Sequence, residues 1–237
     1  MNTKIKRLAE KIGSTPFSEN LTMLAKIYRT DKSLQHNYIP HYERHLKKYR
    51  SREIKLLEIG VGGYNNPEMG GNSLRMWRDY FSQAQIYAID IHDKSKQESE
   101  RIRIFQGSQV DEDFLQKVTI ETGPLDIIID DGSHVNEHVI KTFKILFPVL
   151  KNGGTYVIED TQTSYWPKMG GSSEDLQLSG TMMNFFKQLT DSLNYEEYLL
   201  EDYQPSYYDQ HIVGIHFYHN LIFIEKGDNT EGSNIVE

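Results

Sequence analysis

The 237-residue sequence contains no cysteine. Disulfides, cysteine-ligated zinc or iron–sulfur centres and thiol nucleophiles are therefore excluded. Long apolar runs are also missing, since no stretch approaches the roughly 20 consecutive apolar residues of a membrane-spanning helix. The first residues, MNTKIKRLAEKIGS, lack the continuous apolar run of a secretory signal. These absences predict a cytoplasmic protein with no membrane partner.

Basic residues are outnumbered by acidic ones. The chain has 26 lysines and arginines against 34 aspartates and glutamates, which gives a formal net charge of −8. A negatively charged protein is not drawn unspecifically to a phosphate backbone, so a nucleic-acid partner is not expected. The length suits one domain with a substantial apolar core.

Short apolar runs alternate with helix-length segments from residue 54 onward, whereas residues 4–50 show helical spacing. This alternation is typical of a parallel sheet with crossover helices. The predicted strands are residues 54–60, 85–90, 101–105, 125–131 and 154–160, and the predicted helices are residues 72–82, 111–119, 136–150 and 174–193. Lys151-Asn-Gly-Gly is expected to end the third of these helices.

Two further apolar runs, 211–218 and 221–226, are joined by His219-Asn220. This link is too short for a parallel crossover, so the last strand must run antiparallel to its neighbour. The predicted fold class is α/β: a Rossmann-like sheet of the class I methyltransferase type with helices on both faces, five parallel strands and a terminal hairpin that gives one antiparallel strand. We expect residues 1–50 to form an N-terminal helical cap, 51–226 the α/β domain and 227–237 a disordered tail.

A glycine turn, Glu58-Ile-Gly60-Val-Gly62-Gly63-Tyr64, follows the first predicted strand. Open α/β sheets bind ligands at the carboxyl ends of their strands, and glycine lets the backbone approach a cofactor closely. The dinucleotide fingerprint needs a further glycine where Asn65 stands, so a nicotinamide cofactor is disfavoured. Asp90 ends the second strand, where a carboxylate can bind both ribose hydroxyls. The alternative is that the glycines make only a tight turn and Asp90 caps a helix.

Carboxylates gather after the next two strands. Asp130 and Asp131 end the fourth strand, and Glu159 and Asp160 end the fifth. So many acids repel one another without a cation, and oxygen ligands in a chain without cysteine favour Mg²⁺, Mn²⁺ or Ca²⁺. We predict Asp131, Glu159 and Asp160 as metal ligands, with Asp130 nearer the cofactor or a helix N-terminus. In the alternative interpretation, Asp160 is a helix N-cap.

His134 lies three residues beyond Asp131. A metal at the carboxylates would bind a substrate hydroxyl and lower its proton affinity, and His134 would remove the proton as general base. The alternative is a capping or packing histidine. His134-Val-Asn-Glu-His138 also matches the H-x-x-E-H pattern of some zinc proteases, but that pattern needs both histidines on one helix face, whereas His134 directly follows a strand.

These motifs closely resemble the bacterial macrolide-sugar O-methyltransferases, the family of the mycinamicin and macrocin deoxysugar methyltransferases and related rhamnosyl O-methyltransferases. The resemblance covers roughly residues 25–195 and is carried by YRTDK, LLEIGVGGY, GGNSLRMWRDYF, AIDIHDKS, FQGSQ, DIIIDDGSHVNEHVI and LKNGGTYVIEDTQTSYWP. It implies an enzyme that uses S-adenosylmethionine and Mg²⁺, or else Mn²⁺. It also implies that Asp131, Glu159 and Asp160 bind the metal and that His134 is the base.

The expected cofactor-binding residues are Glu58, Gly60, Gly62, Tyr64, Asp90, Gln106 and Asp130. Residues 161–171 end in glycines, as a hinged lid would. Tyr165 and Trp166 in this segment would stack on a sugar face or, alternatively, pack the loop onto the body. The macrolide enzymes carry an additional N-terminal domain that this chain is expected to lack, which puts their tetrameric assembly in doubt. A homodimer or higher homo-oligomer is the default expectation.

The predicted function is therefore metal-dependent O-methylation of a sugar hydroxyl on a small-molecule glycoside or a glycan. One alternative is a metal-dependent methyltransferase for a phenol or catechol, which is more acidic and needs a base less. Another is a nicotinamide-dependent oxidoreductase, and a third is a catalytically silent binding module with the same fold.

Overall fold

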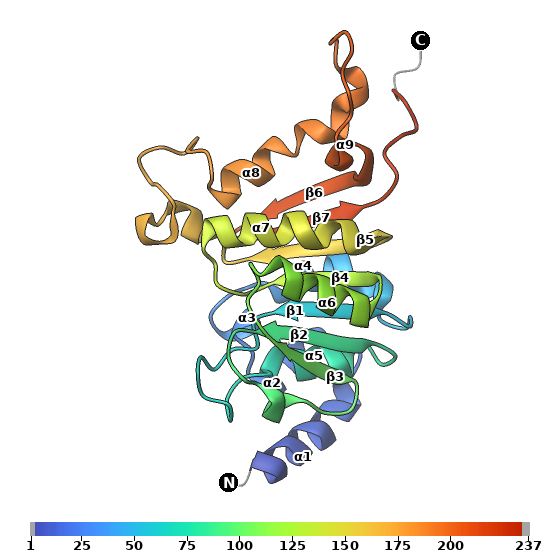
Figure 1. The fold of residues 1–237 in the computed structure, drawn as a ribbon. Coiled ribbons are helices and arrows are strands. Elements are labelled where there is room, and N and C mark those ends of the chain that lie inside the picture. Colours follow the sequence, from blue (N-terminus) through green and yellow to red (C-terminus); the bar gives the residue numbers. More distant parts are fainter. Residues whose placement is uncertain (1–2, 234–237) are drawn as a thin grey trace. The chain divides into compact units, whose positions relative to one another are not determined.

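The computed structural model describes residues 3–233 (Figure 1). The chain divides into two compact units, Met1–Ser108 and Gln109–Glu237. The units thus divide far from residue 50, where the predicted helical cap ends. The last four residues of the predicted tail lie outside the described part. Within residues 3–233, no helix combines the length and the apolar character that crossing a bilayer demands.

The first unit contains a parallel sheet preceded by helices. Strand β2 pairs in parallel with both β1 and β3, which gives the order β3-β2-β1. Its elements are α1 (Thr3–Ser14), α2 (Leu21–Tyr28), α3 (Asp31–Leu34), α4 (Ile39–Leu46), β1 (Lys55–Ile59), α5 (Asn72–Tyr80), β2 (Gln85–Asp90) and β3 (Ile102–Gln106).

Helix α2 shows why the segment before the sheet is helical. The Asn20 side chain accepts a hydrogen bond from the Met23 amide and so satisfies one of the free N–H groups of the first turn. Arg29 ends the helix in the left-handed conformation. The apolar side chains recur at helical spacing and are fully buried: Leu21, Leu24, Ala25 and Tyr28.

The second unit contains a mixed sheet. Strands β4 and β5 are parallel, whereas β7 runs antiparallel to both β5 and β6, in the order β4-β5-β7-β6. Its elements are α6 (Glu112–Thr122), β4 (Leu125–Asp130), α7 (Asn136–Leu146), β5 (Leu150–Glu159), α8 (Met182–Gln188), α9 (Tyr207–His211), β6 (Ile212–Tyr218) and β7 (Leu221–Lys226). The predicted α/β architecture is confirmed, and β6 and β7 at its end pair antiparallel.

Two of the predicted helix bounds are wrong. Helix α7 ends at Leu146, because Pro148 follows in a short 3₁₀ turn, and β5 already begins at Leu150. Lys151-Asn-Gly-Gly therefore lies within the strand, at a shift in its register with β4. The predicted helix 174–193 is interrupted: it contains α8, which begins after Thr181, and the start of a 3₁₀ helix, Asp191–Glu197. The Thr181 side chain caps α8 at the Asn184 amide.

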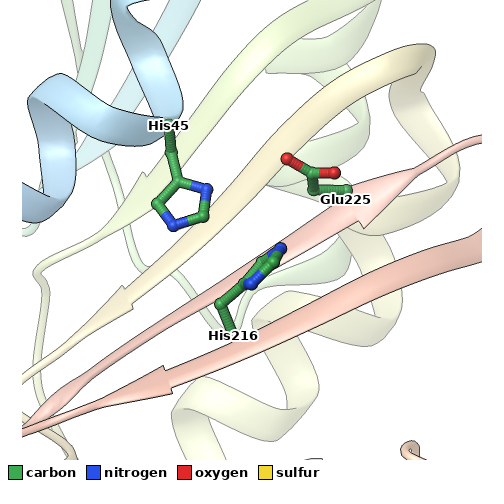
Figure 2. Close-up of side chains that lie close together, drawn as sticks. All are labelled: His45, His216 and Glu225. Carbon is green, nitrogen blue, oxygen red and sulfur yellow. The ribbon is translucent and has the colours of Figure 1, made fainter.

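Two polar side chains of the hairpin, His216 on β6 and Glu225 on β7, are shown in Figure 2. A Cβ built on Gly214 would lie 3.5 Å from both His216 Nε2 and Glu225 Oε2. These two groups therefore flank the backbone at Gly214. His45, also labelled in the figure, belongs to α4 of the first unit.

Lys226 ends β7 and is only 4% exposed. Its Nζ donates to the carbonyl oxygens of Phe147 (3.2 Å) and Pro148 (2.9 Å). The ammonium also lies over the rings of Phe147 and Tyr207, 5.4 and 5.2 Å from their centroids. Burial lowers the pKa of Lys226 from 10.5 to about 8. The buried charge ties β7 to the turn after α7 at the cost of its hydration.

The pH dependence of unfolding is expected to change in Lys226→Met. Between pH 8 and 10.5 the unfolded chain holds the Lys226 proton and the folded chain has lost it, so the wild type gains stability relative to the variant as pH rises. We expect a relative gain of about 1 to 2 kcal/mol between pH 7.5 and 9.5, measured by urea unfolding of both proteins. A difference that is constant with pH would contradict the assignment.

Candidate functional site

The glycine turn lies at the carboxyl end of β1 and is held by Asp90. The Asp90 carboxylate accepts hydrogen bonds from the amides of Val61 (3.0 Å) and His92 (2.9 Å). Gly60 and Gly62 have φ values of 95° and 76°, which L side chains rarely adopt. A Cβ on Gly62 would have no atom within 4 Å. The turn therefore leaves open backbone, and Asp90 shapes it while each of its oxygens keeps a lone pair for a further donor.

Glu58 faces a cation from the N-terminal segment. Its Oε1 lies 3.3 Å from Nζ of Lys32 on α3, and both side chains are fully buried. A buried carboxylate is costly unless it is paired, so Lys32 provides the countercharge. The sequence interpretation named Glu58 as a cofactor-binding residue; in the structure a lysine of YRTDK is its partner.

The other two residues predicted around the cofactor in this unit lie differently. Gln106 ends β3 and is in register with Asp90, so these two residues are neighbours at the carboxyl edge of the sheet. Tyr64 has a φ of 47° and is 90% exposed. Its ring projects into solvent from the glycine turn.

Asp130 ends β4 and is buried. Burial raises the pKa of its carboxyl to about 7, although hydrogen bonds from the Gly132 amide and the Gln109 side chain act to lower the pKa. The Gln109 Nε2 lies 3.3 and 3.4 Å from the two Asp130 oxygens. Within the second unit, the Asp130 carboxyl therefore accepts hydrogen bonds from Gln109 and from the turn that joins β4 to α7.

Asp131, His134 and Asp160 form one group in which an oxygen or nitrogen atom from each lies within 4.8 Å of the others. His134 Nε2 is 3.6 Å from Asp160 Oδ2 and 3.8 Å from Asp131 Oδ1. Like charges at this distance are unfavourable without a cation. The structure thus brings together two of the predicted metal ligands and the predicted base. Glu159, the third predicted ligand, is the buried last residue of β5 and is not part of this group of described residues.

The N-cap alternative for Asp160 and the zinc-protease pattern find no support. Asp160 precedes a 3₁₀ helix, Thr161–Tyr165, but its side chain makes no capping hydrogen bond. His134 lies outside α7, whereas His138 lies within it and its Nδ1 is 3.0 Å from Ser133 Oγ. The two histidines therefore have different surroundings, and the zinc-protease interpretation is wrong.

Gln109 holds the turn that carries Asp131 and His134. Its Oε1 accepts from the Ser133 amide (2.8 Å), and its Nε2 donates to Thr142 Oγ1 on α7 (3.0 Å) as well as to Asp130. Thr142 Oγ1 also donates to the Gln109 carbonyl at 3.0 Å. One buried amide thus joins the end of β4, the following turn and α7.

Residues 161–171 are held by buried Asn136. Its Nδ2 donates to the carbonyls of Thr163 (3.1 Å) and Met169 (2.8 Å), and its Oδ1 accepts from the Met182 amide. Gly171 packs so closely that an added Cβ would lie 2.4 Å from the Ser164 carbonyl oxygen. The glycine thus serves close packing, and the hydrogen bonds argue against a hinge at either end of the predicted lid.

Tyr165 and Trp166, in the same segment, are 37% and 47% exposed. Both rings therefore keep accessible surface, and contact with a substrate stays a prediction for them.

The sequence interpretation overlooked the residues that hold the site. Gln109, Asn136 and Lys32 lie within the quoted motifs FQGSQ, DIIIDDGSHVNEHVI and YRTDK. Their partners are distant in the sequence, as with Gln109 and Thr142, which are 33 residues apart. The sequence can indicate that a polar residue next to a strand end is buried. It cannot show which distant residue forms the hydrogen bond with it.

Gln109→Leu is expected to destabilise the protein by about 2 kcal/mol, because it leaves the Ser133 amide and the Asp130 carboxyl without their buried partner. Urea unfolding measures the effect. Gln116→Leu, at an exposed position on α6, is the matched control and should change stability by less than about 0.5 kcal/mol. Equal effects in the two variants would contradict the role of Gln109.

Several known proteins are similar to this chain. A family model described as "Methyltransferase domain" matches residues 68–161. Mycinamicin VI 2''-O-methyltransferase from Micromonospora griseorubida is 47% identical over 215 residues, which are 90% of this chain and 54% of the relative. Demethylmacrocin O-methyltransferase from Streptomyces fradiae is 48% identical over 223 residues, 93% of this chain and 56% of the relative.

A solved structure, MycE methyltransferase from the mycinamycin biosynthetic pathway in complex with Mg and SAH, superposes with a TM-score of 0.87 at 47% identity. The alignment covers 90% of this chain and 56% of that chain. The chain therefore spans about half the length of the relatives it matches. The resemblance to the macrolide-sugar O-methyltransferases and the Rossmann-like methyltransferase fold are confirmed.

Proposed function

We propose that this chain, a relative of the macrolide-sugar O-methyltransferases, transfers a methyl group from S-adenosylmethionine to a sugar hydroxyl of a glycosylated small molecule. The Asp131, His134 and Asp160 group is the observation that supports this proposal best, because it combines hard oxygen ligands with a base at the ends of β4 and β5. The two relatives are named as O-methyltransferases of mycinamicin VI and of demethylmacrocin, and the likeness to the macrolide-sugar family supports a sugar acceptor here.

The donor set fits a divalent cation. Asp131 and Asp160 offer carboxylate oxygens within 4.8 Å of one another, and Glu159 adjoins Asp160 at the end of β5. Mg²⁺ or Mn²⁺ takes such ligands together with water and substrate oxygens. When bound, the cation supplies positive charge that lowers the pKa of a coordinated hydroxyl. The MycE structure was solved with Mg and SAH, which supports the same pair of ligands for this chain.

His134 is the proposed base. Its Nε2 lies 3.8 Å from Asp131 Oδ1 and 3.6 Å from Asp160 Oδ2, so the ring is next to the proposed metal ligands. The acceptor oxygen forms a bond to the methyl carbon, the bond from that carbon to sulfur breaks, and S-adenosylhomocysteine leaves. The hydroxyl proton goes to His134. A sugar alcohol is a weak acid, so its oxygen needs this proton transfer more than a phenol does.

The first unit is the proposed cofactor-binding part. Gly60 and Gly62 expose backbone at the end of β1, and Asp90 and Gln106 lie side by side at the ends of β2 and β3. This arrangement suits a nucleoside with its ribose at Asp90. Tyr64 is free to cover the nucleoside because its ring is exposed. Tyr165 and Trp166 of the second unit are the proposed sugar-stacking side chains.

Titration of S-adenosylhomocysteine and Mn²⁺ into the purified protein tests both ligands. We expect the wild type to bind both, and Asp131→Asn to weaken Mn²⁺ affinity at least tenfold because it removes a charged ligand. Asp113→Asn, an exposed position on α6, is the control and should bind Mn²⁺ like the wild type. Failure of the wild type to bind S-adenosylhomocysteine would refute methyl transfer, and an unchanged Mn²⁺ affinity in Asp131→Asn would refute the metal site.

Turnover of His134→Gln distinguishes the acceptors. With a deoxysugar glycoside we expect methyl transfer to fall by about 100-fold or more, because the alcohol loses its general base. Mn²⁺ affinity, measured in parallel, should stay within about threefold of the wild type and so separate base loss from metal loss. Undiminished turnover of a glycoside, or efficient turnover of a catechol alone, would contradict the sugar assignment.

A further inference from the structure

Two site residues have unusual backbone conformations. His134, in the turn after β4, has a φ of 55°, and Asp160, in the turn after β5, has a φ of 54°. The left-handed conformation costs an L residue about 1 kcal/mol or more, although His and Asp adopt it more readily than most. Such residues persist where surrounding contacts hold them. The two turns therefore need a restraint.

Thr163 provides a contact to both turns. Its hydroxyl lies 2.7 Å from the carbonyl oxygen of His134, 29 residues away, and 3.3 Å from that of Asp160. The single hydroxyl proton is directed mainly to His134, at the shorter distance. The Thr163 amide also lies 3.3 Å from the Asp160 carbonyl oxygen, to which it donates. One buried residue thus joins the backbone of the predicted base to the backbone of a predicted metal ligand.

Thr163 is itself held in place. Its carbonyl oxygen accepts from Asn136 Nδ2 and from the Trp166 amide, each at 3.1 Å. Asn136 is the first residue of α7 and is buried. The hydroxyl is consequently fixed relative to α7 and to the 3₁₀ helix that follows β5. A fixed donor can hold the carbonyl of His134, whereas a mobile one could not.

We propose that Thr163 is a positioning residue: its hydroxyl sets the spacing of the His134 and Asp160 turns, and through it the geometry for metal binding and proton transfer. This inference rests on the proposed function, which places both residues in the active site. If the hydrogen bond only stabilised the fold, its loss would lower the unfolding temperature without changing the surroundings of the His134 ring or the affinity for metal. The two roles therefore differ in measurable ways.

Three variants separate the hydroxyl from the methyl group. Thr163→Ala removes both groups, Thr163→Ser keeps the hydroxyl, and Thr161→Ala removes a methyl and a hydroxyl from the same 3₁₀ helix. Thr161 is equally buried, and its Oγ1 makes no hydrogen bond within the described part of the chain. Thr161→Ala is therefore the matched control for loss of volume.

The readouts are Mn²⁺ affinity by electron paramagnetic resonance, the imidazole NMR signals of His134 in the metal-free protein, and the thermal unfolding midpoint. We expect Thr163→Ala to weaken Mn²⁺ binding about tenfold, as loss of groups that orient metal ligands does, and to shift the His134 signals. Thr163→Ser should restore both towards the wild type, and Thr161→Ala should leave both unchanged even where it lowers the unfolding midpoint.

Wild-type Mn²⁺ affinity and unshifted His134 signals in Thr163→Ala would overturn the proposal. So would equal losses in Thr163→Ala and Thr161→Ala, or no recovery in Thr163→Ser. If the wild type binds no Mn²⁺, the metal site of the proposed function is contradicted. In that case the His134 signals alone test the role of Thr163. Should Thr163→Ala not fold, Thr163→Ser with unchanged His134 signals supports the proposal, and Thr163→Ser with shifted signals overturns it.

Discussion

Negative charge concentrated at the ends of β4 and β5 is the constraint on which the second unit depends. Asp131 and Asp160 face the same imidazole, and Asp130 beside them is buried with a raised pKa. Each carboxylate loses hydration, and their proximity adds repulsion. An unsupported loop would relax by moving these groups apart. The protein therefore needs a rigid frame around them, and buried polar side chains supply that frame.

The frame consists of hydrogen bonds between side chains and backbone. Gln109 forms a hydrogen bond to the turn after β4. Thr163 links the turn after β5 to the turn after β4, and Asn136 forms hydrogen bonds to residues 161–171. All three side chains are buried, where hydrogen bonds are not exchanged with water and where each lost partner is costly. The same rigidity suits catalysis, because charged groups that are already in position need no reorganisation when a reaction begins.

The strands and the acidic residues at their ends could be predicted because both depend on local patterns. Continuous apolar runs mark buried strands, as in β4, and a parallel sheet brings successive strand ends to one edge. The frame could not be predicted in this way, since hydrogen bonds such as that from Thr163 to His134 join residues that no periodicity relates. The wrong helix bounds have local causes, namely Pro148 after α7 and the cap at Thr181.

Glu58 and the aspartates of the second unit show two ways of balancing a carboxylate. Lys32 supplies Glu58 with a countercharge from the chain itself, and neither side chain is accessible to solvent. Asp131 and Asp160 keep 18% and 17% of their side-chain surface exposed. Partial exposure lets a countercharge there exchange with solvent, which the proposed metal and the proposed proton transfer to His134 would both require. Glu58, paired with Lys32, thereby joins α3 to β1 in a place that water does not reach, whereas the aspartates of the second unit stay open to exchange; a contact of Glu58 with a cofactor stays a prediction.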